Sequence, residues 1–258
     1  MRFSTAFYND NDPYCCRVLR KQVAAGNLPG GMVDGRDIED IDFTELAGYR
    51  QVHLFAGIGG IPLGLRLAHV PDTLSILTGG FPCQDISRAG RRAGIHGDRS
   101  SLWREIAHAV CDLRPRFVLV ENTPSLLVRG MSVVLGDLAA LGYDAEWDCL
   151  PAASFGAPHI RDRLFLLAER KDPVRNPLLY DALRRRHGAP KKALFAGRGG
   201  VELSARWAGE PSVCRVAHGL PRELDRFRRE RIRMLGNAVV PQVVEWIGRR
   251  LLAALGHG

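Results

Sequence analysis

The stretch Gly79-Gly80-Phe81-Pro82-Cys83-Gln84-Asp85-Ile86-Ser87 follows the apolar run Leu74–Leu77. A short apolar run that ends in Gly-Gly-x-Pro is typical of a buried parallel strand, which delivers a rigid loop to the carboxyl edge of a sheet. Because α/β folds place their chemistry at that edge, Cys83 is a candidate nucleophile. The cysteine alone is weak evidence for catalysis, since a free cysteine is more often a small buried apolar residue.

The composition limits what kind of protein this is. A chain of 258 residues with 46% hydrophobic residues suits one α/β domain with a small appendage. Its apolar runs are too short to span a bilayer and its first residues lack a signal-peptide block, so we expect a cytoplasmic protein without a membrane partner. The six cysteines form no Cys-x-x-Cys pair, which argues against structural zinc, and we expect no bound metal. The net charge of +8 favours a polyanionic partner.

Two other segments carry polar residues or glycines at strand ends. The apolar strand predicted for residues 117–120 ends in Glu121-Asn122, which suits either a functional carboxylate or an ordinary ion pair with a surface arginine. The loop Phe55-Ala56-Gly57-Ile58-Gly59-Gly60 joins a predicted strand to a predicted helix, as in loops that approach a ligand closely. A nicotinamide cofactor would suit this loop too, but Pro62 replaces the last glycine of that fingerprint.

An acidic turn, Asn9-Asp10-Asn11-Asp12-Pro13-Tyr14, follows the strand predicted for residues 2–8 and leads into a helix predicted for Arg17–Val23. The simpler interpretation of Asp10 and Asp12 is a solvated turn with a helix N-cap. The alternative is an acidic residue at a strand end that accepts hydrogen bonds from ribose hydroxyls, as in dinucleotide-binding folds.

These segments, together with Gly156–Arg163 and Gly236–Pro241, resemble the motif set of the DNA (cytosine-5) methyltransferases. The joint occurrence of Pro-Cys-Gln, Glu-Asn, Arg-x-Arg and Gly-Asn-x-Val-x-Pro is highly specific, and the resemblance covers about residues 6–170 and 218–255. It implies an enzyme with a doubly wound, Rossmann-like α/β sheet. Such an enzyme uses S-adenosyl-L-methionine to methylate C5 of cytosine in double-stranded DNA.

The resemblance implies catalytic roles for four residues. Cys83 would add to C6 of a flipped-out cytosine, and Glu121 would interact with N3 of the ring. Arg161 and Arg163 would hold the adduct and stabilise its charge. Substrate contacts are expected from Gln84, Ser87, Asn122 and His159. His159 stands where the family generally has Gln, and Thr123 where it has Val.

The resemblance also implies a cofactor site. Asp10 takes the position of the acidic residue that holds the ribose, where the family usually has the longer Glu. Asp37 takes the position of the Asp that contacts the adenine amino group, and Ile38 that of the apolar residue packed on the ring. Further cofactor contacts are expected from Asn11, Phe55, Ala56, Gly57, Gly59, Gly60, Pro82, Asn237 and Val239.

The order of these motifs departs from the family. The motifs that contain Asp10 and Asp37 precede the glycine-rich strand, whereas the family has them after it. We therefore predict a permuted order of the first strands on an unchanged sheet, with the strand at residues 2–8 beside the strand at 51–55. This compact arrangement is similar to methyltransferases carried by phages, which suggests modification of viral DNA against host restriction in an infected bacterial cell.

The sequence divides into three segments. We expect a catalytic, S-adenosylmethionine-binding domain at residues 1–170, a short basic target-recognition region at 171–217, and a segment at 218–258 that returns to the catalytic domain. The short basic region equally suits a clamp that grips phosphates without reading bases. A tRNA cytosine-5 methyltransferase and an inactive, DNA-binding regulatory relative are the alternative functions, and we expect a monomer.

Overall fold

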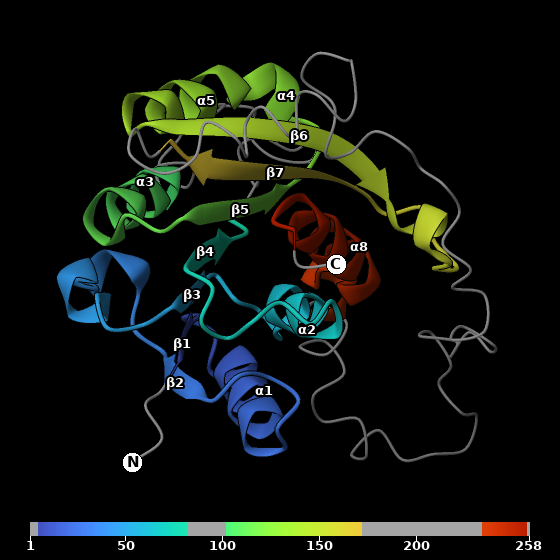
Figure 1. The fold of residues 1–258 in the computed structure, drawn as a ribbon. Helices are drawn as coiled ribbons and strands as arrows, with labels where there is room; N and C mark the ends of the chain where they lie inside the picture. Colours follow the sequence, from blue (N-terminus) through green and yellow to red (C-terminus); the bar gives the residue numbers. More distant parts are fainter. Residues whose placement is uncertain (1–4, 82–101, 172–233, 257–258) are drawn as a thin grey trace.

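A single mixed sheet organises the part of the chain that the structure describes. The computed structural model describes residues 5–81, 102–171 and 234–256, and Figure 1 shows their arrangement. Seven strands of these segments pair in the order β2-β1-β3-β4-β5-β7-β6. The strands are β1 (Ala6–Asn9), β2 (Gly31–Asp34), β3 (Gln51–Leu54), β4 (Ile76–Gly79), β5 (Phe117–Asn122), β6 (Tyr143–Pro151) and β7 (Asp162–Arg170). Neighbours from β2 to β5 are parallel, and β7 is antiparallel to both β5 and β6.

Helices cover both faces of this sheet (Figure 1). On one face lie α3 (Leu102–Leu113), α5 (Met131–Ala140) and the 3-10 turns η1 (Ile38–Asp40) and η2 (Phe43–Leu46); on the other lie α1 (Pro13–Ala24), α2 (Gly60–Leu67) and α8 (Pro241–Ala254). The short helix α4 (Leu126–Arg129) precedes α5, and the 3-10 turn η4 (Ala152–Phe155) joins β6 to β7. Every residue of β5 is buried, as expected for a strand covered on both sides. The predicted doubly wound α/β fold is confirmed.

The strand neighbours confirm the spatial prediction made from the motif order. β1 pairs with β2 on one side and with β3 on the other, and Phe7 lies opposite Val52 in that second pair. The strand that leads into the glycine-rich loop, β3, thus follows β1 and β2 both in the chain and across the sheet. The described strand covers Ala6–Asn9, so it begins later and ends one residue further on than predicted.

One helix is longer than the sequence pattern indicated. Its expected span was Arg17–Val23, but α1 begins at Pro13. The carboxylate of Asp12 accepts the backbone N–H of Tyr14 at 2.8 Å, and Pro13 needs no partner in the first turn. Asp12 is thus a helix N-cap, in agreement with the simpler interpretation of the acidic turn.

Glycines bring α2 and α8 into close contact. A methyl group on Gly60 would lie 2.3 Å from the carbonyl oxygen of Val239, and one on Gly64 would lie 2.5 Å from both Val244 Cβ and the Pro241 carbonyl. Gly248 on the opposite helix faces Ala68 in the same way, at 2.6 Å. Because real Cβ contacts are longer, this packing requires glycine at each position. The C-terminal helix is therefore fixed beside the glycine-rich loop that opens α2.

We predict that Gly64→Ala destabilises the fold by about 1–3 kcal/mol, because the new methyl group overpacks a helix contact that cannot widen freely. Gly136 in α5 is a matched control, since a Cβ there would have nothing within 4 Å. Gly136→Ala should stabilise the protein by about 0.5–1 kcal/mol through helix propensity alone. Urea unfolding of both variants measures the two shifts, and equal shifts would contradict the packing argument.

A polar network is buried inside the first half of the sheet. His53 on β3 is fully buried, and its Nδ1 lies 2.8 Å from the hydroxyl of Thr78 on β4. Its ring stacks on Tyr8 of β1 at a centroid distance of 5.1 Å. The Tyr8 hydroxyl donates to the Pro29 carbonyl at 2.9 Å. Burial lowers the pKa of His53 to about 3, so the ring stays neutral in the folded protein at ordinary pH.

This lowered pKa predicts a loss of stability in mild acid. Below the ordinary His pKa the unfolded chain binds a proton that folded His53 does not, so the free energy of unfolding falls as the pH falls. Between pH 7 and pH 5 the loss from this one group should be about 2 kcal/mol. We expect His53→Gln to lack this component of the pH dependence in urea unfolding. His108→Gln, at an exposed position, should keep it.

Candidate active site

Three chain segments meet at the carboxyl edge of the sheet around Glu121. Glu121 and Asn122 end β5, and the last register pair between β4 and β5 is Gly79 with Val120. Gly80 and Phe81 therefore leave β4 beside these two polar residues. Because β7 runs antiparallel to β5, its first residues lie at the same edge, where Leu164 pairs with Asn122.

Glu121 forms an ion pair with Arg163 at the start of β7. The distance from Arg163 Nε to Glu121 Oε1 is 3.1 Å, and the Glu121 side chain is only 11% exposed. Burial raises the pKa of Glu121, and the nearby charges of Arg163 and Arg161 offset part of this effect. The outcome is a carboxyl group with a raised pKa and a fixed orientation, which suits proton exchange with a substrate.

Arg161 connects this edge to the segment before α8. Its Nη1 donates to the carbonyl oxygen of Gly236, whereas within the described structure its buried Nε and Nη2 have no hydrogen-bond partner. Burial lowers the pKa of Arg161, the charge of Arg163 lowers it further, and Glu121 opposes both. The residue also has a φ of 31°, an uncommon value for a non-glycine residue. Two buried guanidinium nitrogens with unpaired N–H groups leave capacity to bind an acceptor.

The glycine-rich loop is held by the acidic turn that follows β1. Asp10 accepts the backbone N–H of Gly57 at 2.8 Å and that of Asp12 at 3.0 Å. The N–H of Ala56 donates to the Asn9 carbonyl at 2.8 Å. Burial raises the pKa of Asp10, and these backbone hydrogen bonds work in the opposite direction. The loop itself needs left-handed backbone at Phe55, with φ of 51°, and at Gly57 and Gly59.

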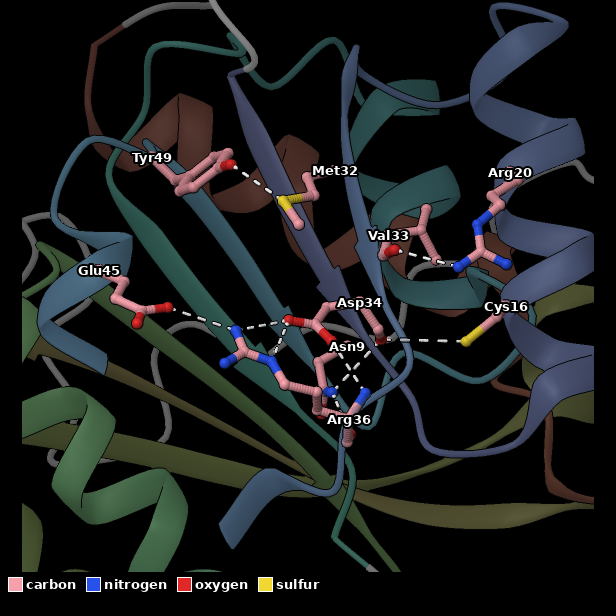
Figure 2. A network of polar contacts seen from close by, with 9 residues as sticks. All are labelled: Asn9, Cys16, Arg20, Met32, Val33, Asp34, Arg36, Glu45 and Tyr49. Atoms are coloured by element: carbon pink, nitrogen blue, oxygen red, sulfur yellow. Dashed lines mark hydrogen bonds and ion pairs between the residues drawn. The ribbon is translucent and has the colours of Figure 1, made fainter. Parts of the chain in front are cut away.

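The loop after β2 approaches the same region, and Figure 2 shows the contacts that shape it. Asn9, at the end of β1, donates its Nδ2 to the Arg36 carbonyl at 2.9 Å. The Asp34 carboxylate binds the Arg36 guanidinium at 2.8 Å, and Arg36 also reaches Glu45 at 3.4 Å (Figure 2). Burial works to raise the pKa of Asp34, but its bonds to Arg36 outweigh this and hold the pKa below its usual range.

This network places two predicted cofactor residues together. Asn11 Nδ2 donates to Asp37 Oδ2 at 3.0 Å, and both side chains are exposed to solvent. Ile38, expected to pack on an adenine ring, is 2% exposed and belongs to the hydrophobic core. Asn9 and Arg36, which shape this loop, were not among the predicted site residues. The available signal was an Asn at the end of a buried strand, since a buried amide must find hydrogen-bond partners.

The remaining predicted residues are divided between solvent and the undescribed segments. His159 and Asn237 are exposed, and Val239 is half-buried where its carbonyl faces Gly60. Four predicted residues lie outside the described residues: Pro82, Cys83, Gln84 and Ser87. The predicted recognition region at 171–217 lies outside them too, except for its first residue.

Other features of the described segments lie apart from this edge. A cavity of about 610 Å³ is lined by the end of α2, the turn after α1 and two residues of α8, Glu245 and Arg249. None of the predicted site residues lines it. Within the described ranges no cluster of three His, Cys, Asp or Glu side chains has the geometry to hold a metal ion. No helix in these ranges is both long and apolar enough to cross a membrane.

Comparison with known proteins relates part of the chain to a known family. A family model described as C-5 cytosine-specific DNA methylase matches residues 67–194, which include the ends of β4 and β5 and the start of β7. This segment of the chain is similar to the C-5 cytosine-specific DNA methylases. Glu121, Arg161 and Arg163 all lie within the matched residues.

Individual relatives agree with this assignment. Type II methyltransferase M.PspPI of Psychrobacter sp. (strain TA137) is 31% identical over 186 residues, which are 70% of this chain and 36% of the relative. Type II methyltransferase M.SsoII of Shigella sonnei is 27% identical over 209 residues, which are 63% of this chain and 55% of the relative. The matched region thus spans about half or less of these methylases.

A solved structure shares the fold of the chain. The methyltransferase EhMeth of Entamoeba histolytica matches with a TM-score of 0.54 at 10% identity, over 96% of this chain and 90% of that one. At this identity the similarity supports a methyltransferase fold and says nothing about individual site residues.

The ion pair predicts the direction of a pKa change at Glu121. Arg163→Met keeps side-chain length but removes the charge, so the pKa of Glu121 should rise further above its usual range. Arg116→Met is the control, because it breaks a comparable pair with Glu169 elsewhere on the sheet. A ¹³C NMR titration of labelled glutamate carboxyl groups separates the two sites. An unchanged Glu121 pKa in Arg163→Met would contradict the proposed electrostatic coupling.

Proposed function

We propose that this protein transfers a methyl group from S-adenosyl-L-methionine to C5 of cytosine in double-stranded DNA. The observation that carries the proposal is the buried Glu121–Arg163 pair, which lies beside the two residues that lead into Pro82 and Cys83. The match to the methylase family model and the net charge of +8 support a DNA substrate. The type II methyltransferases among the relatives support a role in DNA modification.

The glycine-rich loop, together with Asp10 and the Asn11–Asp37 pair, fits S-adenosyl-L-methionine. α2 begins at Gly60, and its N-cap residue Gly59 has no side chain to cap it, so the first N–H groups of the helix are available to the carboxylate of an amino acid. Asp10 offers acceptor oxygens for ribose hydroxyls, and Asn11 with Asp37 offers acceptors for an amino group on a base. When bound there, the cofactor supplies an electrophilic methyl group.

The chemistry proposed for cytosine begins with its activation, because C5 is a poor nucleophile. The Cys83 thiolate adds to C6 and forms an Sγ–C6 bond, while N3 gains a proton and the π electrons shift towards C5. Glu121, with its raised pKa, is the proposed partner of N3. C5 then takes the methyl group, and the C5 proton and the thiolate are lost. Return of the N3 proton to Glu121 completes the release of neutral 5-methylcytosine.

The two arginines have separable parts in this proposal. Arg163 orients Glu121, and Nε and Nη2 of Arg161 can donate to acceptor oxygens of the activated nucleotide. None of the reacting atoms can be reached inside a duplex, so the cytosine must be flipped out of the helix. The permuted motif order and an origin in phage DNA modification stay predictions.

The function is tested by incubating the protein with labelled S-adenosyl-L-methionine and unmethylated DNA, followed by bisulfite sequencing. We expect 5-methylcytosine at a recurrent short motif. Cys83→Ser and Glu121→Gln should each lower kcat by at least about 100-fold, because each removes a group that takes part in bond making. Near-normal methylation by either variant would contradict the covalent mechanism. Methylation of tRNA but not of DNA would contradict the proposed substrate.

A further inference from the structure

Asn122 uses both ends of its side-chain amide to hold the main chain. It is the last residue of β5 and is 2% exposed. Its Nδ2 donates to the carbonyl oxygen of Phe81 at 3.1 Å, and its Oδ1 accepts the N–H of Thr123 at 2.8 Å. The sequence resemblance implied a substrate contact for Asn122, but these two bonds direct the amide towards the protein's own backbone.

The bond to Phe81 extends the sheet beyond its last backbone pair. The ladder between β4 and β5 ends at Gly79 and Val120, so the Phe81 carbonyl has passed the end of the strand. A buried carbonyl without a partner is costly, and the Asn122 amide supplies that partner. The side chain thus replaces a backbone donor where β4 turns into its loop.

Two further contacts restrict the same segment. The Phe81 ring is 3% exposed and packs on Trp103 at a centroid distance of 5.7 Å. On its other side, a methyl group on Gly80 would lie 3.1 Å from Glu121 Oε2, so the backbone passes close to the carboxylate. Gly80 and Phe81 are therefore fixed by a hydrogen bond, a ring contact and the limited space beside Glu121.

The restraint on Phe81 acts on the residues that follow it in the chain. Pro82 has a fixed φ and restricts the conformation of the residue before it, so the direction of the Phe81 carbonyl strongly limits the path towards Cys83. We propose that Asn122 is a positioning residue, which fixes the start of the Cys83 loop relative to Glu121 and does not touch the substrate. This inference rests on the proposed role of Cys83 as nucleophile.

The test compares Asn122→Ala and Asn122→Leu with a matched control. Leu has the branched shape of Asn and larger terminal groups but no donor, whereas Ala removes both the donor and the side-chain volume, so an effect common to both variants reports loss of the bond. Asn9→Ala is the control, because Asn9 is also a buried strand-end Asn, 1% exposed, whose Nδ2 holds a backbone carbonyl at 2.9 Å. Melting temperatures check that each full-length variant is folded.

Two measurements give the outcome. In both Asn122 variants, amide hydrogen exchange in the peptide that contains Gly80 and Phe81 should be about fivefold faster, and in Asn9→Ala it should be unchanged. In methylation assays, kcat of the Asn122 variants should fall by about tenfold or more, while KM for DNA stays within about threefold of wild type.

Specific results would overturn the inference. A raised KM for DNA with an unchanged kcat in the Asn122 variants would make Asn122 a substrate contact. Faster exchange at Gly80 and Phe81 in Asn9→Ala as well would show a general loosening of the sheet. If the wild-type protein methylated no DNA, the proposed function would fail, while the exchange comparison would still decide whether Asn122 holds this segment.

Discussion

The parallel register of β4 with β5 is the constraint on which the candidate active site depends. It ends both strands at the same level of the sheet, so Gly80 and Phe81 emerge beside Glu121 and Asn122. The antiparallel strand β7 then starts at the same level and brings Arg163 to the carboxylate. A shift of β4 by one residue would reverse the faces of its side chains and separate these groups. Three chain segments meet at one edge because backbone hydrogen bonds fix their ends, and long flexible side chains are not needed to bring them together.

Much of this architecture could be predicted from the sequence, because short apolar runs, glycines and strand-end polar residues are local signals. The strands around residues 51–55, 76–79 and 117–122 follow from such signals, and the motif order correctly predicted that β1 lies beside β3. The helix that begins at Pro13 was predicted to begin four residues too late, because composition suggests the Asp12 cap but does not fix where it forms. The partners of Asn9 and the close contact of Gly64 with Val244 could not be predicted, because tertiary packing decides both.

The proposed cofactor site and the proposed catalytic site are built in different ways. Around Gly57 the backbone is held by carboxylate and carbonyl acceptors, so left-handed residues stay in place without a ligand to organise them. Around Glu121 the order comes from one ion pair and from the hydrogen bond of the Asn122 side chain to Phe81, and two guanidinium nitrogens of Arg161 remain unpaired in the described structure. Preorganised backbone suits a ligand that is common to many reactions. Unpaired donors suit a partner whose oxygen atoms arrive only with the substrate.

The pairing of α2 with α8 has a consequence for the order in which the protein can be completed. The strands and loops of the proposed cofactor site lie in the first 67 residues. The helix that covers Ile61 and Leu65 is α8, the last helix of the described chain. A ribosome therefore exposes this apolar surface long before its cover exists, since N-terminal segments emerge first. The glycine contacts that close it tolerate no added methyl group, so another apolar helix would be a poor substitute. The interval between the synthesis of α2 and that of α8 is thus the period in which the nascent chain is most exposed to aggregation.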